Sequence, residues 1–380
     1  GITLNDGVLY WTNSPRSNIG SSPLTVNGGQ LDGRLENFTV TELSGSGGEI
    51  SVYRRTFTVN QDTNTTYAGV IEDFNGVVSS GNGTTFTKGG TGTLTLSGNN
   101  TYSKVTTVNN GTLEVSGALY SAGTNGTTSN ITVGAAGTLD FTGAGSLGSG
   151  AAFDGNIANA GTFNYNSTTD QTLSGIISGA GVLTKDNTST LTLSGVNTYT
   201  GNTTVSAGTL QIGGAGQLGN GDYSGDIAVA SGATFQYISS ASGPVSKYHG
   251  DISGDGTLIK DSNTGELRLF GNNSIDNIEI NQGILRGAAD ANSLGDAGTT
   301  ISLGDTSGTA AATLAYGGTV NFTTKAGINV RAGSSGTKTI FNINGTVTDN
   351  TAITLNDSLT INDNSALTLG GVILSIINIS

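Results

Sequence analysis

The 380-residue sequence contains no cysteine, no methionine and only three prolines. The absence of cysteine excludes disulfides and thiolate metal sites, and it leaves the redox compartment undetermined. The low proline content excludes a collagen-like chain and a proline-rich linker. Because Gly1 stands where an initiator methionine would be expected, we predict a mature chain from which a secretion leader has been removed.

Charged residues are also scarce, at 11% of the chain, and the formal net charge is −13. The 14 lysines and arginines are spread along the sequence and form no basic patch. This argues against binding to nucleic acid or to an anionic membrane surface. No apolar run reaches the roughly 18 residues that a membrane-spanning helix needs. We therefore expect an extracellular protein of a bacterial surface, covered by threonine, serine, asparagine and glycine.

The sequence does contain many short runs that alternate apolar and polar residues and end at glycine or asparagine. In Thr93-Leu94-Thr95-Leu96, for example, leucine and threonine would occupy opposite faces of a strand. A small unit of glycine followed by alternating apolar residues recurs at spacings of roughly 20 to 30 residues, the range of solenoid repeats. Its copies begin at Gly111, Gly137, Gly161, Gly208, Gly232 and, in degenerate form, Gly283.

These features predict an all-β fold, a right-handed parallel β-helix (β-solenoid) in the form of an elongated rod. Apolar residues would form inward columns and polar residues would form outward ladders. We expect a single continuous solenoid over residues 1–380, with atypical N-terminal coils in 1–60 and recognisable repeats in 84–287. The C-terminal coils, 300–380, would end in an apolar strand.

A longer repeat carries a resemblance to a known family. The stretch LTLSGNNTYSKVTTVNNGTLEVSG, from Leu94, returns from Leu191 as LTLSGVNTYTGNTTVSAGTLQIGG and from Leu267, in worn form, as LRLFGNNSIDNIEINQGILRG. The first two copies closely resemble the passenger-associated transport repeat of autotransporter passenger domains. The third copy departs from that pattern, with Ile275 in place of tyrosine. The resemblance implies a β-helix at the surface of a Gram-negative-type bacterium and no particular activity.

We searched for catalytic carboxylates because some β-helix proteins act on polysaccharides. Glycoside hydrolysis needs two carboxylates roughly 5–10 Å apart. The candidates that lie close in sequence are Glu72 with Asp73, and Asp251 with Asp255 and Asp261. Since aspartate is common in turns, we interpret these as solvated turn residues and expect no enzyme activity.

Other possible sites are also weak. The only histidine, His249, has no nucleophile motif around it. Asp261–Glu266 faintly resembles a calcium loop but lacks the full ligand pattern. Gly143–Gly148 is glycine-rich, yet no helix signal follows it. Tyr10 and Trp11 form either a sugar-stacking pair or, as we prefer, a cover for the first coil. Glycosylation sequons occur at Asn37, Asn64, Asn82 and Asn130. We expect no cofactor and no metal.

Both ends of the sequence read as strands without polar caps. Because an open coil exposes unpaired backbone groups and core, we predict that copies stack head to tail into a filament. The alternative is that the ends mark a section cut from a longer passenger. The residues expected at the junction are Ile2, Leu4, Val372, Ile373, Leu374, Ile376, Ile377 and Ile379.

Three functions remain open at this point. The first is a non-enzymatic extracellular subunit of a surface filament or matrix, whose partner is itself. The second is an autotransporter-type adhesin that binds cells or glycans as a monomeric rod. The third, which the missing acid–base groups disfavour, is a polysaccharide-active enzyme.

Overall fold

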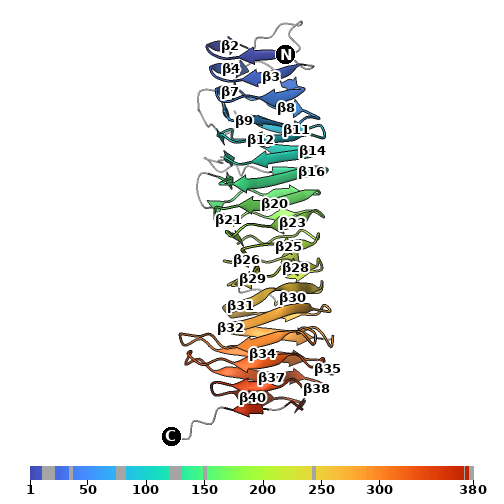
Figure 1. Cartoon of the computed structure of the whole chain (residues 1–380). Coiled ribbons are helices and arrows are strands. Elements are labelled where there is room, and N and C mark those ends of the chain that lie inside the picture. Colours follow the sequence, from blue (N-terminus) through green and yellow to red (C-terminus); the bar gives the residue numbers. More distant parts are fainter. Residues whose placement is uncertain are drawn as a thin grey trace. The chain divides into compact units, whose positions relative to one another are not determined.

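The computed structural model describes residues 1–10, 22–33, 37–73, 83–119, 131–148, 152–241, 245–288, 290–371 and 373–375. The chain divides into two compact units, Gly1–Leu191 and Thr192–Ser380. In each unit short strands lie coil upon coil (Figure 1). All described strand pairings are parallel and join residues roughly 20 to 30 positions apart, as in a solenoid. The predicted all-β parallel β-solenoid is therefore confirmed, whereas the single continuous domain over residues 1–380 stays a prediction.

In the first unit the strands of successive coils stack into three faces of the solenoid. Two long strands, β14 and β16, each bend through two of these faces, because they pair with different partners along their length. The strands that begin in this unit are β1 (Ile2–Leu4), β2 (Val8–Tyr10), β3 (Pro23–Val26), β4 (Gln30–Gly33), β5 (Phe38–Val40), β6 (Glu42–Ser44), β7 (Glu49–Val52), β8 (Thr56–Asn60), β9 (Thr65–Tyr67), β10 (Val70–Asp73), β11 (Thr85–Gly89), β12 (Thr93–Leu96), β13 (Asn99–Asn100), β14 (Thr106–Val115), β15 (Ala118–Leu119), β16 (Ile131–Gly143), β17 (Ser146–Leu147), β18 (Ala152–Phe153), β19 (Ile157–Asn159), β20 (Thr162–Ser167), β21 (Gln171–Leu173), β22 (Ile177–Ser178), β23 (Val182–Lys185) and β24 (Thr190–Leu193), the last of which contains the boundary.

The second unit has the same design, with β31 and β32 as its long bent strands. Its only described helix is a short 3₁₀ turn. Its elements are β25 (Thr203–Val205), β26 (Thr209–Ile212), η2 (Gly219–Gly221), β27 (Asp222–Tyr223), β28 (Ile227–Val229), β29 (Thr234–Tyr237), β30 (Ser246–Tyr248), β31 (Ile252–Leu269), β32 (Ser274–Ala288), β33 (Thr300–Leu303), β34 (Ala312–Gly317), β35 (Val320–Phe322), β36 (Gly327–Val330), β37 (Lys338–Asn344), β38 (Thr346–Asp349), β39 (Ile353–Leu355), β40 (Thr360–Asp363), β41 (Ala366–Leu369) and β42 (Ile373–Ser375).

The core of each unit follows from the two-residue period of its strands. In β20 the burial alternates strictly, so that Phe163 and Tyr165 are fully buried while their neighbours face outward. Equivalent residues then stack from coil to coil. The rings of Phe38 and Phe57 lie 4.4 Å apart and those of Phe57 and Phe86 lie 5.8 Å apart. Since an isolated coil would leave such rings in water, each coil depends on its neighbours for burial.

Candidate functional site

Outward polar side chains form continuous rows across the coils of the second unit. The first row stands at the turn that follows a glycine or alanine in successive coils. Here a side-chain oxygen accepts a backbone N–H from the next coil: Asn202 from Asp226 at 3.0 Å, Asp226 from Asp251 at 3.0 Å, and Asp251 from Asn272 at 2.7 Å. Asn292 extends the row by donating to the Asn272 side chain at 2.7 Å. We call Asn202, Asp226, Asp251, Asn272 and Asn292 the turn row.

A second row runs along an outward strand face of the same unit. The Gln211 amide accepts from Thr192 at 3.1 Å and donates to Gln236 at 2.9 Å. The Asp261 carboxylate accepts from Gln236 at 3.3 Å and from Gln282 at 2.8 Å. We call Thr192, Gln211, Gln236, Asp261 and Gln282 the amide row. Its side chains bond to one another from coil to coil, and Gln282 also donates to the backbone carbonyl of Asp261 at 3.5 Å.

The first unit carries a row of threonines on one outward face. The strand registers place Thr39 beside Thr58, Thr58 beside Thr87, Thr87 beside Thr107, and Thr107 beside Thr132. None of these five side chains is buried. Neighbouring strands in a sheet lie about 4.8 Å apart, so hydroxyl and methyl groups repeat regularly along this face. The predicted outward ladders of threonine and asparagine therefore exist as ordered surfaces.

A stacked pair of carboxylates also lies in the first unit. Glu114 and Asp140 are register partners on β14 and β16. Glu114 accepts hydrogen bonds from the hydroxyls of Thr95, at 3.3 Å, and Thr142, at 2.8 Å. Burial, with smaller contributions from Glu114 and Asp186, raises the pKa of Asp140 to about 6. Its Oδ1 is buried and has no hydrogen-bond partner in the described structure. Asp140 is therefore a titrating group on this face.

The carboxylates considered for catalysis lie in different surroundings. Glu72 and Asp73 are adjacent on β10, so their side chains point to opposite faces. Asp73 is buried and accepts the Thr84 N–H at 2.6 Å, whereas Glu72 faces outward. Asp251 and Asp261 belong to the turn row and the amide row, and Asp255 is exposed. Asp251 and Asp261 thus form hydrogen bonds between neighbouring coils.

The stretch that faintly resembles a calcium loop is part of a strand. Asp261–Glu266 lies within β31, and the Glu266 carboxylate forms ion pairs with Arg268 at 2.9 Å and Arg286 at 3.7 Å. In the described part of the chain, no group of three acidic or histidine side chains gathers where it could hold a metal.

His249 lies on the outside of its coil. Its Nε2 is 3.0 Å from the Asp222 carboxylate, and its ring stacks on Phe270 at 4.5 Å between centroids. Both members of the ion pair are well exposed, with 43% and 58% of their side-chain surfaces accessible. The pair therefore contributes a surface contact between coils.

Three other candidate features from the sequence are placed as follows. Tyr10 is 59% exposed in β2, while Trp11 lies outside the described residues. The sequon residues Asn37 and Asn64 accept backbone N–H groups of Thr56 and Thr93, each at 2.8 Å. The sequons at residues 82 and 130 are outside the described ranges. Gly143 ends β16, and no α-helix follows it in the described residues.

The junction residues predicted at the two ends are described only in part. Ile2 and Leu4 are half-buried in β1, and Ile373 is 50% exposed in β42. The side chain of Leu374, together with Val372, Ile376, Ile377 and Ile379, falls outside the described residues. Near the first end, a shallow groove of about 470 Å³ is lined by residues from three coils. Its polar lining includes Asp6, Gln30 and Glu49.

Sequence reasoning missed a set of buried lysines, one shortly before each copy of the long repeat. Lys88, Lys185 and Lys260 are fully buried at the ends of apolar strand segments. The Lys88 ammonium donates to three backbone carbonyls, those of Gly89, Gly90 and Asn110, at 2.7, 3.0 and 3.3 Å. Lys185 and Lys260 likewise donate to backbone carbonyls one or two residues further along the chain. Burial lowers the pKa of each of the three to about 8.

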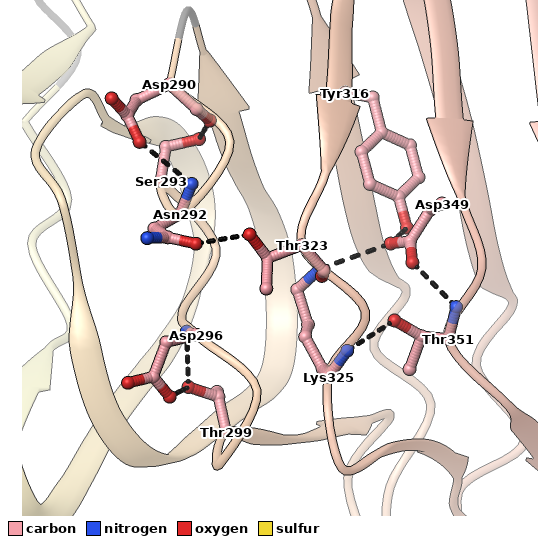
Figure 2. Close-up of polar contacts among 10 residues, drawn as sticks. All are labelled: Asp290, Asn292, Ser293, Asp296, Thr299, Tyr316, Thr323, Lys325, Asp349 and Thr351. Atoms are coloured by element: carbon pink, nitrogen blue, oxygen red, sulfur yellow. Dashed lines mark hydrogen bonds and ion pairs between the residues drawn. The ribbon is translucent and has the colours of Figure 1, made fainter.

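A fourth buried lysine, in the second unit, meets a carboxylate instead. Figure 2 shows Lys325 beside Asp349, whose carboxylate also receives the hydroxyl of Tyr316. The Nζ–Oδ2 distance is 3.3 Å, and the exposed side-chain fractions are 0% and 1%. Next to this cluster the Thr323 hydroxyl donates to Asn292, the last member of the turn row. For Lys88 and Lys185 the signal in the sequence is their place directly after an apolar-polar pair, in Phe86-Thr87-Lys88 and Leu183-Thr184-Lys185.

Comparisons with known proteins agree with this architecture. Residues 86–115 and 183–212 match the family model of the passenger-associated transport repeat. These are the first two copies predicted from the sequence, and the third copy lies outside the matched residues. The chain is also 35% identical over 243 residues to the adhesin BmaC autotransporter of Brucella suis biovar 1 (strain 1330). That alignment covers 61% of this chain and 6% of the relative.

No solved structure matches the chain. The described residues include no helix that could serve as a membrane span. The repeat matches and the parallel solenoid confirm the predicted resemblance to autotransporter passenger repeats.

Proposed function

Since this chain is a parallel β-solenoid built with passenger-associated transport repeats, we propose that it is a section of a non-enzymatic, adhesin-like autotransporter passenger at the outside of a bacterium. The observation that carries the proposal is the similarity over 243 residues to a protein named as an adhesin autotransporter. The chain spans only 6% of that relative, so its own binding role has to be tested on this chain.

The surface offered for contact is the set of outward polar rows. A flat face that repeats the same hydroxyl or amide group at every coil suits a partner that also repeats, such as a glycan chain on a cell surface. Each single contact of this kind is weak in water, because the groups exchange hydrogen bonds with solvent. Many contacts made together raise the overall affinity.

The test is adhesion of beads coated with the 380-residue chain to cultured epithelial cells and to immobilised glycans. We expect several times more bound beads than with a coating of an unrelated acidic protein. A variant with Gln211→Lys and Gln236→Lys disrupts the amide row and should lose that excess. The matched control, Thr204→Lys with Ala228→Lys, changes exposed register partners on the same coils and should keep it. Equal binding of the chain and the unrelated protein on every surface would overturn the proposal.

A second candidate is head-to-tail stacking of copies. The observation that favours it is that apolar side chains in line with the buried core of earlier coils are exposed in the last described coils. Ile361 and Ile373 are 47% and 50% exposed, although their register partners Ile340 and Ile353, one coil earlier, are buried. A further coil would cover these positions, and it would come either from more of the same polypeptide or from a second copy. In the second case Ile2 and Leu4 are the residues expected to meet the C-terminal strand.

Electron microscopy of negatively stained protein separates these cases. If copies stack, the 380-residue chain forms fibres, and a chain that ends at residue 370 does not. A double variant, Ile361→Asp with Ile373→Asp, should also stop fibre growth while leaving the preceding coils folded. Single particles from the intact chain at high concentration would exclude stacking and leave the adhesin proposal untouched.

A further inference from the structure

Lys325 and Asp349 form a buried ion pair that differs from the other lysine contacts of this chain. Lys325 lies in the loop between β35 and β36, and Asp349 ends β38, one coil further on. The register pairs Phe322 with Asp349, which fixes the two segments side by side. The Lys325 Nζ is 3.3 Å from Asp349 Oδ2 and 3.1 Å from the Thr323 carbonyl, and it lies 5.4 Å from the centroid of the Phe322 ring.

The two oxygens of the Asp349 carboxylate are held in different ways. Oδ2 accepts the Tyr316 hydroxyl at 2.8 Å and the Lys325 ammonium. Oδ1 accepts only the backbone N–H of Thr351, at 2.9 Å, among the described contacts. The Thr351 hydroxyl in turn accepts the Lys325 backbone N–H at 2.9 Å. One oxygen is therefore surrounded by proton donors on side chains, and the other is fixed by an amide (Figure 2).

A buried ion pair of this kind carries a large desolvation free energy. Removing an ammonium and a carboxylate from water costs several kcal/mol for each ion, and their attraction does not always offset it. Burial accordingly lowers the pKa of Lys325, while burial and the Asp349 charge raise the pKa of Tyr316 well above its usual value. The amine is thus biased toward its neutral, nucleophilic form, and the phenol stays protonated and able to donate.

We propose that Lys325 and Asp349 condense into an intramolecular isopeptide bond that joins neighbouring coils. A proton first passes from Lys325 Nζ to Asp349 Oδ2, giving a neutral amine and a carboxylic acid. The nitrogen lone pair then attacks the side-chain carboxyl carbon, a C–N bond forms, and the bond from that carbon to Oδ2 breaks. Oδ2 leaves as water with two protons that were on the ammonium, and the third stays on the amide nitrogen. The ion pair and the product have the same net charge, and no oxidant or co-reactant is needed.

Two neighbours of the pair have defined roles in this step. The Thr351 N–H faces Oδ1, the oxygen that is retained, and stabilises the negative charge that develops there during attack. The Tyr316 hydroxyl donates to Oδ2, the oxygen that departs, and stabilises the negative charge that develops on it as its bond to carbon breaks. Tyr316 therefore acts as a positioning residue.

The other buried lysines provide an internal comparison. Lys88, Lys185 and Lys260 donate to backbone carbonyls, which are not electrophiles of this kind. Lys338 does meet a carboxylate, with Nζ 2.7 Å from Asp357 Oδ2, but 33% of the Asp357 side chain is exposed. Hydrogen bonds from the Lys338 ammonium and from the backbone N–H of Ser358 lower the pKa of Asp357, which favours its charged form. Among the described lysines, Lys325 combines burial with a buried carboxyl group.

The cross-link would close a span of 24 residues between adjacent coils. Strands β35 and β38 could then no longer separate when the chain is pulled. A covalent link of this type is useful in a protein without cysteine, which cannot form disulfides.

The test is the intact mass of the purified, denatured 380-residue chain. We expect most molecules to be lighter than the sequence mass by one water molecule. Trypsin should fail to cleave after Lys325, and the digest should contain a branched peptide that joins residues 287–331 to residues 339–380. A mass equal to the sequence mass, both in fresh protein and after prolonged incubation, would overturn the proposal. A water deficit mapped elsewhere, for example to a succinimide, would do so as well.

Variants separate the bond from other modifications. Lys325→Arg and Asp349→Ala should each restore the full sequence mass, and Lys338→Arg should leave the deficit unchanged. Tyr316→Phe should slow the appearance of the branched peptide by roughly tenfold or more, as expected for the loss of a donor to a reacting oxygen. A branched peptide that forms at the same rate in Tyr316→Phe would remove the role assigned to Tyr316.

Discussion

At the scale of single residues, Asp140 shows how the stacking of coils changes the pKa of a carboxyl group. Its side chain lies beside Glu114, and burial raises its pKa to about 6 from a usual value near 3.8. Between these values the folded state binds the proton more tightly than the unfolded chain does. The free energy of unfolding therefore falls as the pH rises through about 4 to 6.

We predict that Asp140→Asn removes this pH dependence. The variant should gain stability relative to the wild type by about 1–2 kcal/mol on going from pH 4 to pH 7, since part of the full shift is screened by solvent. Denaturation by guanidinium chloride at the two pH values measures the difference. The same stability difference at both values would mean that Asp140 has the same pKa in the folded and the unfolded chain, contrary to the rise attributed to its burial.

The stability contribution of Lys88 depends on pH in the opposite direction. Burial lowers its pKa to about 8 from 10.5, so the folded state releases the proton more readily and stability rises with pH between these values. Lys88→Met leaves one buried and two partly buried carbonyls without their donor, and we expect it to lower the free energy of unfolding by about 1–3 kcal/mol. The loss should be larger at pH 9.5 than at pH 7.

The control for this prediction is Lys247→Met. Lys247 is 40% exposed and makes only a 3.6 Å ion pair with an exposed aspartate, so its loss should change stability by less than about 0.5 kcal/mol. Chemical denaturation of the two variants side by side gives the comparison. If Lys88→Met is as stable as Lys247→Met, the carbonyls of the turn find other donors.

These residues also mark what the sequence could not predict. The alternation of Leu94 and Leu96 with threonine indicates which side chains face inward, because a strand has a period of two. The same rule places Lys88 inward, after Phe86, but a buried lysine contradicts the usual preference of this residue for solvent. Its partners are carbonyls of turn glycines and an asparagine on the next coil, and only the fold brings them together.

At the scale of the coil, the recurring glycines serve two different purposes. Gly111, Gly208 and Gly283 have left-handed φ values of 63°, 64° and 79°, as predicted for tight turns. Gly137 and Gly161 have no such φ. A side chain at either of them would lie 2.3 Å from a carbonyl oxygen of the preceding coil. The sequence predicted the turn requirement, whereas the close approach of coils is visible only in the structure.

Gly283 and Gly232 allow these two requirements to be separated. Both have a left-handed φ, yet a Cβ at Gly283 would lie 1.9 Å from the Ser262 carbonyl oxygen, and a Cβ at Gly232 would meet nothing within 4 Å. We predict that Gly232→Ala costs about 1–2 kcal/mol, the penalty for the backbone conformation alone. Gly283→Ala should cost more, about 3 kcal/mol or above, because the coil must shift. Thermal unfolding of both variants tests this order, and equal losses would contradict it.

The strand pattern predicted the fold class well but not the paths of individual strands. Asp261–Glu266 looks like a loop in the sequence because it combines aspartate, asparagine and glycine. In the structure it continues β31, since Asp261 is tied to Gln236 and Gln282 in the rows of neighbouring coils. Here the hydrogen bonds between coils outweigh the local preference for a turn. The two partners of Asp261 lie more than 20 residues away in sequence, so local sequence patterns do not reveal them.

At the scale of the whole chain, a solenoid differs from a globular domain in how far a local substitution affects the stability of other residues. Each coil contacts mainly the coils before and after it, so stability is close to a sum of local terms. The long-range pairings follow this rule: β11 pairs with β8 and β14, and β37 pairs with β34 and β40. A single defect should therefore open nearby coils and leave distant ones closed.

Hydrogen exchange of Lys88→Met tests this locality. In the wild type, Lys88 joins β11 to Asn110 in β14. We therefore expect amide exchange in Thr85–Gly89 and Thr106–Val115 to accelerate in the variant by at least about tenfold. A tenfold change corresponds to a loss of roughly 1.4 kcal/mol in the free energy of local opening. Exchange in Gly327–Val330 and Lys338–Asn344, in the second unit, should stay within the error of the wild type. Acceleration of the same size in all four segments would show that the chain unfolds as one cooperative body, because only global opening exposes amides in both units to the same degree.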